Sequence, residues 1–189
     1  MSSIKTSEKS SIYVALLRGI NVGGKHCLPM QELARIFTQL KCVNVRTYIQ
    51  SGNVVFSTPP KLVKDLPGIV SKTIEQRFGF SAPVVLRTRE QLAQTVRGNP
   101  FLKAGLPEQT LHVYFLADQP SAAGVKSLGP DRSAPDRFHV AGREIYLHVP
   151  NGSTKLTSAY FDSRLSTVCT ARNWATVIQL LELMQSSAS

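Results

Sequence analysis

The sequence predicts an α+β fold of two tandem units, at residues 12–100 and 108–185, preceded by a disordered tail at residues 1–11. In the first unit, strands are predicted by short runs that are apolar or that alternate apolar and polar residues, and helices by stretches of helical periodicity. Their order is β-α-β-β-α-β. The second unit has a looser version of the same order. Because this order is that of the split βαβ, or ferredoxin-like, arrangement, we expect two tandem ferredoxin-like subdomains.

The first unit begins with a strand and a loop that contains glycines. The apolar run at residues 14–17 predicts a buried strand, and Arg18 and Gly19 end it. Pro29 suits the first turn of a helix. Apolar residues then recur at helical spacing, at Met30, Leu33, Phe37 and Leu40.

A hairpin is predicted at residues 43–57, where the alternating run VNVRTYIQ leads into a turn at residues 50–53. We expect Val43, Val45, Thr47 and Ile49 on one face, and Arg46, Tyr48 and Gln50 on the other. On an open sheet, an arginine, an aromatic ring and an amide are groups with which RNA-recognition modules bind bases. The interpretation that we favour is that the second unit covers this face, so that they form a polar layer between the units.

Further patterns complete the first unit. A second helix ends at Gly79, and Pro67 either confines its regular part to the later turns or kinks it; its apolar positions are Val63, Leu66, Val70, Ile74 and Phe78. Residues 82–87 predict a strand. The sequence Thr88-Arg89-Glu90-Gln91 has the spacing of a capping box at the start of another helix.

For the second unit we expect a strand at residues 111–117, a short helix at 121–128 and paired strands at 137–140 and 144–149. A helix at residues 160–168 and a final helix at residues 174–184 complete it. The final helix carries a continuous apolar stripe, made of Trp174, Val177, Leu180, Leu181 and Met184.

Charge is unevenly distributed along the chain. The formal net charge is +10; residues 1–100 hold 14 Lys or Arg against 5 Asp or Glu, and residues 101–189 hold 8 against 7. A basic first half fits a surface for phosphates or nucleic acid, and it fits a role in solubility equally well. No apolar run is long enough for a signal peptide or a membrane span, so we expect a cytoplasmic protein without membrane contact.

Cofactor and metal chemistry find no support in the residue spacing. The three cysteines are far apart, odd in number and without CxxC spacing, which disfavours disulfides and a cysteine zinc site. The four histidines show no metal-binding spacing. We therefore expect neither a cofactor nor a metal, while the oligomeric state stays open.

The loop after the first strand is the main candidate site. Gly23, Gly24 and Lys25 can present backbone N–H groups and a cation to an anion. The spacing from Gly19 to Lys25 imitates a phosphate-binding loop of nucleotide hydrolases, but His26 stands where Ser or Thr should hold magnesium, so hydrolysis is disfavoured. The alternative is that the glycines only permit a tight turn.

Two residues before the final helix form a second candidate. Asn173 fits as the N-cap of that helix. Arg172 must find an acceptor, which could be a carboxylate, a backbone carbonyl or a bound anion; a structural clamp is the interpretation that we favour. The full set of predicted ligand-binding residues is Arg18, Asn21, Gly23, Gly24, Lys25, Arg46, Gln50, Asn53, Arg172 and Asn173.

The segments YVALLRGINVGGK, RTYIQSGNVVFS, FHVAGREIYLHVPNG, KLT and TARNWATVIQLLEL occur here in that order. In them the chain, from about residue 12 to residue 183, resembles the domain of unknown function 1697 family. The resemblance implies a bacterial-type soluble protein with paired ferredoxin-like subdomains and no settled activity.

The leading hypothesis is a binding module for a phosphate-bearing ligand, with nucleic acid the first candidate. The alternative is an enzyme or sensor for a small phosphorylated or carboxylated metabolite, bound in a cleft between the units. A third possibility is a purely structural or protein-interaction role. The residues identify no catalytic group.

Overall fold

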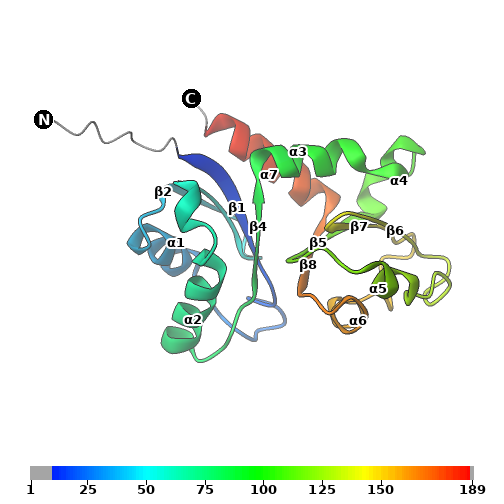
Figure 1. Cartoon of the computed structure of the whole chain (residues 1–189), viewed down its shortest axis with the longest axis horizontal. Coiled ribbons are helices and arrows are strands. Elements are labelled where there is room, and N and C mark those ends of the chain that lie inside the picture. The colour runs from blue at the N-terminus through cyan, green and yellow to red at the C-terminus, as the bar shows by residue number, and fades with distance from the viewer. Residues whose placement is uncertain (1–9, 188–189) are drawn as a thin grey trace, which may run out of the picture.

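The computed structural model describes residues 10–187, which form two four-stranded antiparallel sheets with helices (Figure 1). The predicted tail lies outside the described residues except for Ser10 and Ser11, and Ser11 begins the first strand. No helix among residues 10–187 is long and apolar enough to cross a membrane.

The first unit has the predicted order of elements. These are β1 (Ser11–Leu17), α1 (Met30–Gln39), β2 (Val43–Tyr48), β3 (Asn53–Thr58), the 3-10 turn η1 (Pro60–Leu62), α2 (Leu66–Phe78) and β4 (Val84–Thr88). In space the strands lie in the order β2-β3-β1-β4, and all three pairs are antiparallel. Helix α2 begins at Leu66, with Pro67 in its first turn, and, as predicted, Gly79 ends the helix with a φ of 77° that favours glycine.

The second unit repeats this topology. Its elements are β5 (Leu111–Leu116), α5 (Ala122–Lys126), β6 (Arg137–Ala141), β7 (Glu144–His148), α6 (Ser158–Leu165) and β8 (Cys169–Asn173). The strand order β6-β7-β5-β8 matches that of the first sheet, position by position. The two halves are therefore alike in how their strands are connected, even where their sequences differ.

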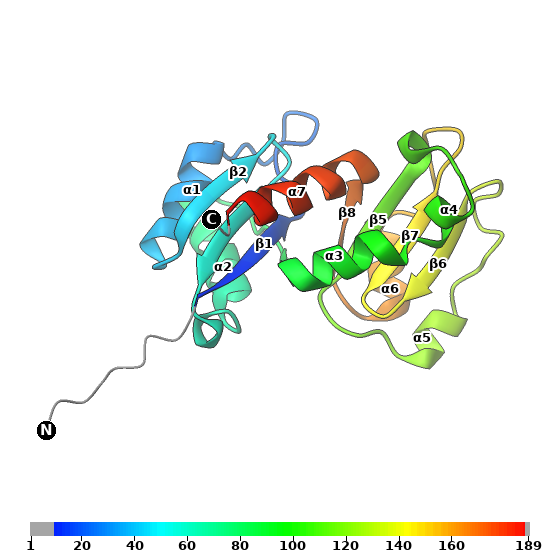
Figure 2. The ribbon, with the colours of Figure 1, turned by 90° about the horizontal axis from the view of Figure 1, so that it is seen from above.

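Each unit is followed by a helix, and these two helices lie between the sheets. After β4 come α3 (Arg89–Gly98), α4 (Pro100–Lys103) and the 3-10 turn η2 (Glu108–Thr110), and after β8 comes α7 (Trp174–Ser186). Figure 2 shows α7 running across the first sheet and α3 running toward the second. The capping box at Thr88 and Gln91 is present at the start of α3.

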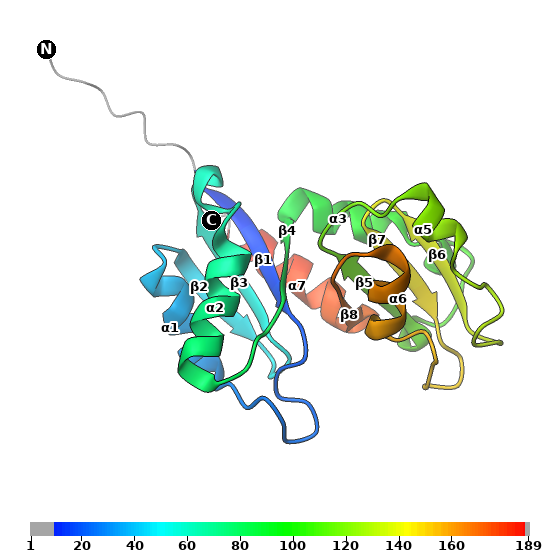
Figure 3. The same cartoon turned by 60° about the horizontal axis from the view of Figure 1, so that its bottom comes forward.

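Three apolar clusters make the core. One packs α1 and α2 on the first sheet, and another packs α6 on the second. The third joins both sheets through α7; it includes Val14, Leu16, Phe115, Trp174 and Leu180. Figure 3 shows α1, α2 and α6 on the near side of the sheets, with α3 and α7 behind. Because β1 contributes to two of these clusters, it is buried on both faces.

The predicted helix at residues 160–168 is too long, and a strand was missed. Helix α6 ends at Leu165, and Ser166 takes a φ of 53° at its C-cap. The chain then forms β8, which pairs with β5. Arg172, predicted at a helix start, is therefore a strand residue. The missed strand carries polar residues at Thr170 and Arg172, whose burial depends on partners in the other unit.

The predicted alternation of the first hairpin is also wrong at both ends. The β2–β3 pairing shifts register between Val43 and Arg46, where Asn44 has a φ of 53°. The irregularity leaves Val43 53% exposed, and Ile49, in the turn, is 50% exposed. In the middle the expectation holds, because Val45 packs on the α1–α2 cluster and Tyr48 packs on the α7 cluster.

Candidate functional site

The loop between β1 and α1 is braced at its base by Asn21. Its Oδ1 accepts from the Leu28 N–H at 2.8 Å, and its Nδ2 donates to the carbonyls of Leu28 and Gln50, both at 2.9 Å. Asn21 adopts a φ of 55°, which asparagine tolerates better than most residues. The side chain thus fixes the loop to the β2–β3 turn, and its amide group has a structural use.

The tip of this loop, Gly23, Gly24 and Lys25, is exposed. Val22 and Lys25 form an isolated bridge, in which the Lys25 N–H donates to the Val22 carbonyl at 3.0 Å. The N–H groups of Gly23 and Gly24 donate to no described residue. Both glycines have positive φ, and a Cβ on either would meet open space. The tip therefore keeps two backbone donors and one cation on the surface.

Aromatic packing supports the same loop. The His26 ring stacks on Phe80 with centroids 4.7 Å apart, and its Nδ1 lies 3.0 Å from the Gly19 carbonyl oxygen. The neighbouring Cys27 is exposed. Through the His26 ring the loop thus contacts Phe80, in the segment between α2 and β4.

Arg18 is used between the units. Its Nη1 donates to Oδ2 of Asp162 on α6, and it lies 3.4 Å from the Cys169 carbonyl oxygen. Its charge therefore already has a carboxylate partner, although the side chain is partly exposed.

The most deeply buried of the predicted site residues with a formal charge is Arg172, which is 7% exposed. Its donors reach uncharged oxygens of six residues: Thr170 Oγ1 (2.9 Å), Ala171 O (2.6 Å), Leu17 O (2.8 Å), Ser51 O (3.0 Å), Gly52 O (3.3 Å) and Asn53 Oδ1 (2.5 Å). Burial lowers the pKa of the guanidinium to about 10. The structural-clamp interpretation is confirmed, because these oxygens occupy the Nε, Nη1 and Nη2 groups from within the chain.

Arg87, which the sequence analysis did not single out, is the counterpart of Arg172. It is 1% exposed, and its Nε donates to Oε1 of Glu144 at 2.8 Å. Its Nη2 donates to the carbonyls of Leu116 (2.8 Å) and Arg143 (2.9 Å). Burial lowers its pKa, and the Glu144 carboxylate opposes that shift.

The two arginines occupy equivalent places. Arg87 is opposite Val14 in the β1–β4 pair, as Arg172 is opposite Val113 in the β5–β8 pair. Each reaches from the last strand of its own unit to the end of the first strand of the other unit. Each is followed by an N-cap residue, Thr88 or Asn173, before a helix. The signal in the sequence was an arginine just before a helix cap in both VVLRT and CTARN.

The predicted site residues thus separate into two groups. Those at the tip and on the hairpin surface, Gly23, Gly24, Lys25, Arg46 and Gln50, are exposed. Those whose polar side chains are engaged within the chain are Arg18, Asn21, Asn53, Arg172 and Asn173. The first group offers the Gly23 and Gly24 N–H groups and the side chains of Lys25, Arg46 and Gln50 to a ligand without breaking bonds among the described residues. In the second group the exposed Asn173 also keeps its Nδ2 without a partner among them.

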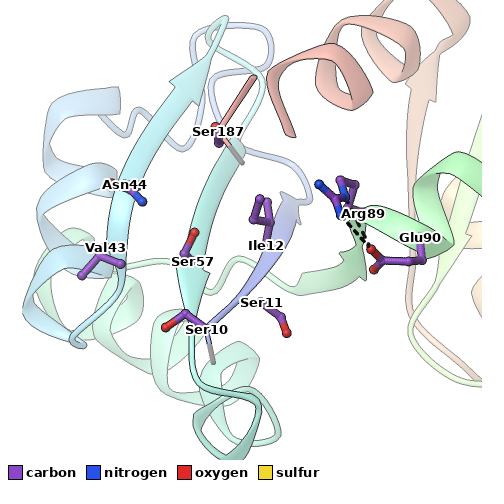
Figure 4. Close-up of a pocket in the computed structure, with 9 residues that line it drawn as sticks. All are labelled: Ser10, Ser11, Ile12, Val43, Asn44, Ser57, Arg89, Glu90 and Ser187. Atoms are coloured by element: carbon purple, nitrogen blue, oxygen red, sulfur yellow. Dashed lines mark hydrogen bonds and ion pairs between the residues drawn. The ribbon is translucent and has the colours of Figure 1, made fainter. Parts of the chain in front are cut away.

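Among the surface cavities of residues 10–187, four have volumes of about 350 to 530 Å³. None of these four has a lining residue from the loop at 18–29 or from Arg172 and Asn173. The largest lies over the end of the first sheet, next to Ile12 and Ser57 (Figure 4).

Comparison with known proteins identifies a family and a fold. The model of a family described as "Protein of unknown function (DUF1697)" matches residues 11–146. No curated protein matches the sequence. Among solved structures, the chain is similar to the conserved bacterial protein SP0830 from Streptococcus pneumoniae, with 21% identity and a TM-score of 0.66 over 93% of this chain and 99% of that one. At this identity the likeness concerns the fold alone.

Proposed function

Since this chain belongs to the DUF1697 family, whose function is unknown, we propose a role from its own surface. The chain binds a phosphate-bearing ligand, with nucleic acid the first candidate, through Gly23, Gly24 and Lys25 at the tip of the loop between β1 and α1. Arg46 and Gln50, exposed on the neighbouring hairpin, extend this surface.

One observation carries the proposal: the loop offers exposed donors on a fixed base. Gly23, Gly24 and Lys25 are exposed together. Asn21 closes the base of the loop with two hydrogen bonds to Leu28 and holds it to the β2–β3 turn with one to the Gln50 carbonyl. Successive N–H groups beside a cation suit a phosphate oxygen. The surrounding unit is basic, with 12 Lys or Arg against 4 Asp or Glu in residues 10–100.

The test is fluorescence anisotropy with labelled single- and double-stranded oligonucleotides at several salt concentrations. We expect binding that weakens as salt rises, because counterions are released from the phosphates. Lys25→Ala should weaken binding to all sequences alike and reduce the slope of log K against log salt by about 1. The matched control is Lys155→Ala, which removes another exposed loop lysine, in the second unit. The proposal fails if no oligonucleotide binds at low salt, or if both variants bind like the original chain.

The alternative function, an enzyme or sensor for a small phosphorylated or carboxylated metabolite, has less support. This function requires a cleft lined by the loop between β1 and α1 and by Arg172 and Asn173. None of the four cavities has such a lining. A thermal-shift screen would support it if a phosphorylated metabolite raised the melting temperature and Lys25→Ala abolished the effect.

We also propose that each unit is a ferredoxin-like subdomain and that the protein is cytoplasmic. The first proposal is supported by the shared β-α-β-β-α-β order and by the matching strand orders of the two sheets. The proposal of a cytoplasmic protein is supported by the three cysteines, Cys27, Cys42 and Cys169, which are all free thiols.

A further inference from the structure

We propose that the cavity at the end of the first sheet is a second binding site, for an uncharged ring that carries several hydroxyl groups, such as a monosaccharide or a cyclic polyol. The cavity has a volume of about 530 Å³, which is within the range of small-molecule sites. Its lining residues lie in or next to β1, β2, β3, the start of α3 and the end of α7: Ser10, Ser11, Ile12, Val43, Asn44, Ser57, Arg89, Glu90 and Ser187.

A hydroxyl without a protein partner borders this cavity. Ser57 is only 6% exposed, and its hydroxyl makes no hydrogen bond with any residue in 10–187. The side chains of Ser11 and Asn44 likewise have no partner among those residues. Figure 4 shows Asn44 and Arg89 on opposite sides of the space next to Ile12 and Ser57. The Ser57 hydroxyl is not among the fully buried side-chain atoms that lack a partner, so it is accessible from the cavity and can bond to a ligand there.

The equivalent place in the second unit is filled by a ring of the chain itself. His148, opposite Leu111 in β5, corresponds to Ser57, opposite Ile12 in β1. The ring of Phe101, just after α3, packs on His148 with centroids 6.1 Å apart, and the Arg137 guanidinium lies 5.7 Å from the Phe101 centroid. In the first unit no aromatic side chain is among the lining residues, and Ser187 lies at the rim instead. At the corresponding position of the second unit, the chain itself therefore supplies a ring.

The lining chemistry selects hydroxyl groups over charge or an aromatic base. Four of the nine residues are serines, and Arg89 and Glu90 bring opposite charges, with N–O distances of 3.4 Å. A phosphate attracted by Arg89 would meet the Glu90 carboxylate as well. A nucleobase would find no aromatic side chain on which to stack.

An uncharged polyol can use every group that the cavity offers. Its hydroxyls can donate to Glu90, accept from Arg89 and do both with Asn44 and the serines. Its C–H surface can pack on Ile12 and Val43. This makes the site independent of the phosphate surface at Lys25.

The experiment is ligand-observed saturation-transfer NMR and calorimetry on the full chain, with neutral hexoses and cyclic polyols, their phosphates, and nucleosides as probes. We expect saturable binding of at least one neutral probe. Ser57→Val should weaken the binding of this probe about tenfold. Ser57→Thr should retain the binding, because threonine has the shape of valine but keeps the hydroxyl. Glu90→Gln, at an exposed position, should also weaken binding without changing the melting temperature.

The result that overturns the proposal is equal affinity of the Ser57→Val and Ser57→Thr variants, binding of phosphates or nucleosides only, or no binding by any probe. Lys25→Ala should leave the binding of the neutral probe unchanged. If that variant loses oligonucleotides but keeps the neutral probe, both sites stand; if oligonucleotides do not bind and the neutral probe does, only the function proposed for the loop fails.

Discussion

Two substitutions of Glu144 test whether the buried Arg87 requires a negative charge or only a hydrogen-bond acceptor in the contact between the units. Arg87 is buried beside Glu144, whereas the equivalent Arg172 is buried among uncharged oxygens, with Asn53 in the place of Glu144. The chain thus already contains a neutral form of the same clamp. Glu144→Gln keeps an acceptor for the Arg87 Nε, and Glu144→Leu removes it.

We expect Glu144→Gln to lower the free energy of unfolding by about 1–2 kcal/mol, because a hydrogen bond is kept and only its charge assistance is lost. Glu144→Leu should lower it by about 3–5 kcal/mol, because a buried guanidinium then loses its partner. The assay is urea unfolding, followed by circular dichroism and by the fluorescence of Trp174. That residue is the only tryptophan and lies in the cluster shared by the two sheets.

One outcome of the two Glu144 substitutions would refute this account. Equal losses for Glu144→Gln and Glu144→Leu would mean that the carboxylate charge, and not the placement of an oxygen, holds the units together. Arg164→Met, which alters an exposed arginine on α6, is the control and should change the stability by less than about 0.5 kcal/mol.

Three further changes test the structure. Asn21→Ala should lower the stability to urea by about 2–3 kcal/mol, since three hydrogen bonds of about 1 kcal/mol each are lost; an unchanged midpoint would contradict the role of the brace. Gly52→Ala should cost about 2–4 kcal/mol, because the φ is +74° and the new Cβ would lie 2.8 Å from the Leu17 Cβ; thermal unfolding measures it, and a cost near zero would refute the close approach. Burial raises the pKa of Tyr146 to about 12 from 10, so the unfolded chain loses this proton first and stability falls as the pH rises from 10 to 12. Tyr146→Phe should reduce that fall by about 1–2 kcal/mol in urea titrations at pH 9.5 and 11.5, and an identical fall in both proteins would contradict it.

Much of the candidate site could not be derived from local pattern. Gly23, Gly24 and Lys25 were predicted because glycines and a lysine after a buried strand suit an anion, and the structure leaves all three exposed. Asn21 was predicted to contact a ligand, yet its partners, Leu28 and Gln50, come together only when the hairpin folds beside the loop. The cavity at Ser57 was not predicted, since its lining comes from five separate elements.

The sequence by itself determined the elements whose patterns are local. Apolar spacing defined α1 and α2, the Thr88 capping box started α3, and the turn before Asn53 closed the first hairpin. These features depend on hydrogen bonds and side-chain contacts between residues a few positions apart, so the chain specifies them directly.

Only the tertiary structure decided the use of the polar residues. Cys169–Asn173 became a strand, and Arg172 became a buried clamp, because uncharged oxygens from β1 and the β2–β3 turn surround it. The same guanidinium in water would have no such preference. Burying a polar group is favourable only where its partners are already in place, and four of the six residues that bond Arg172 are more than a hundred residues away along the chain.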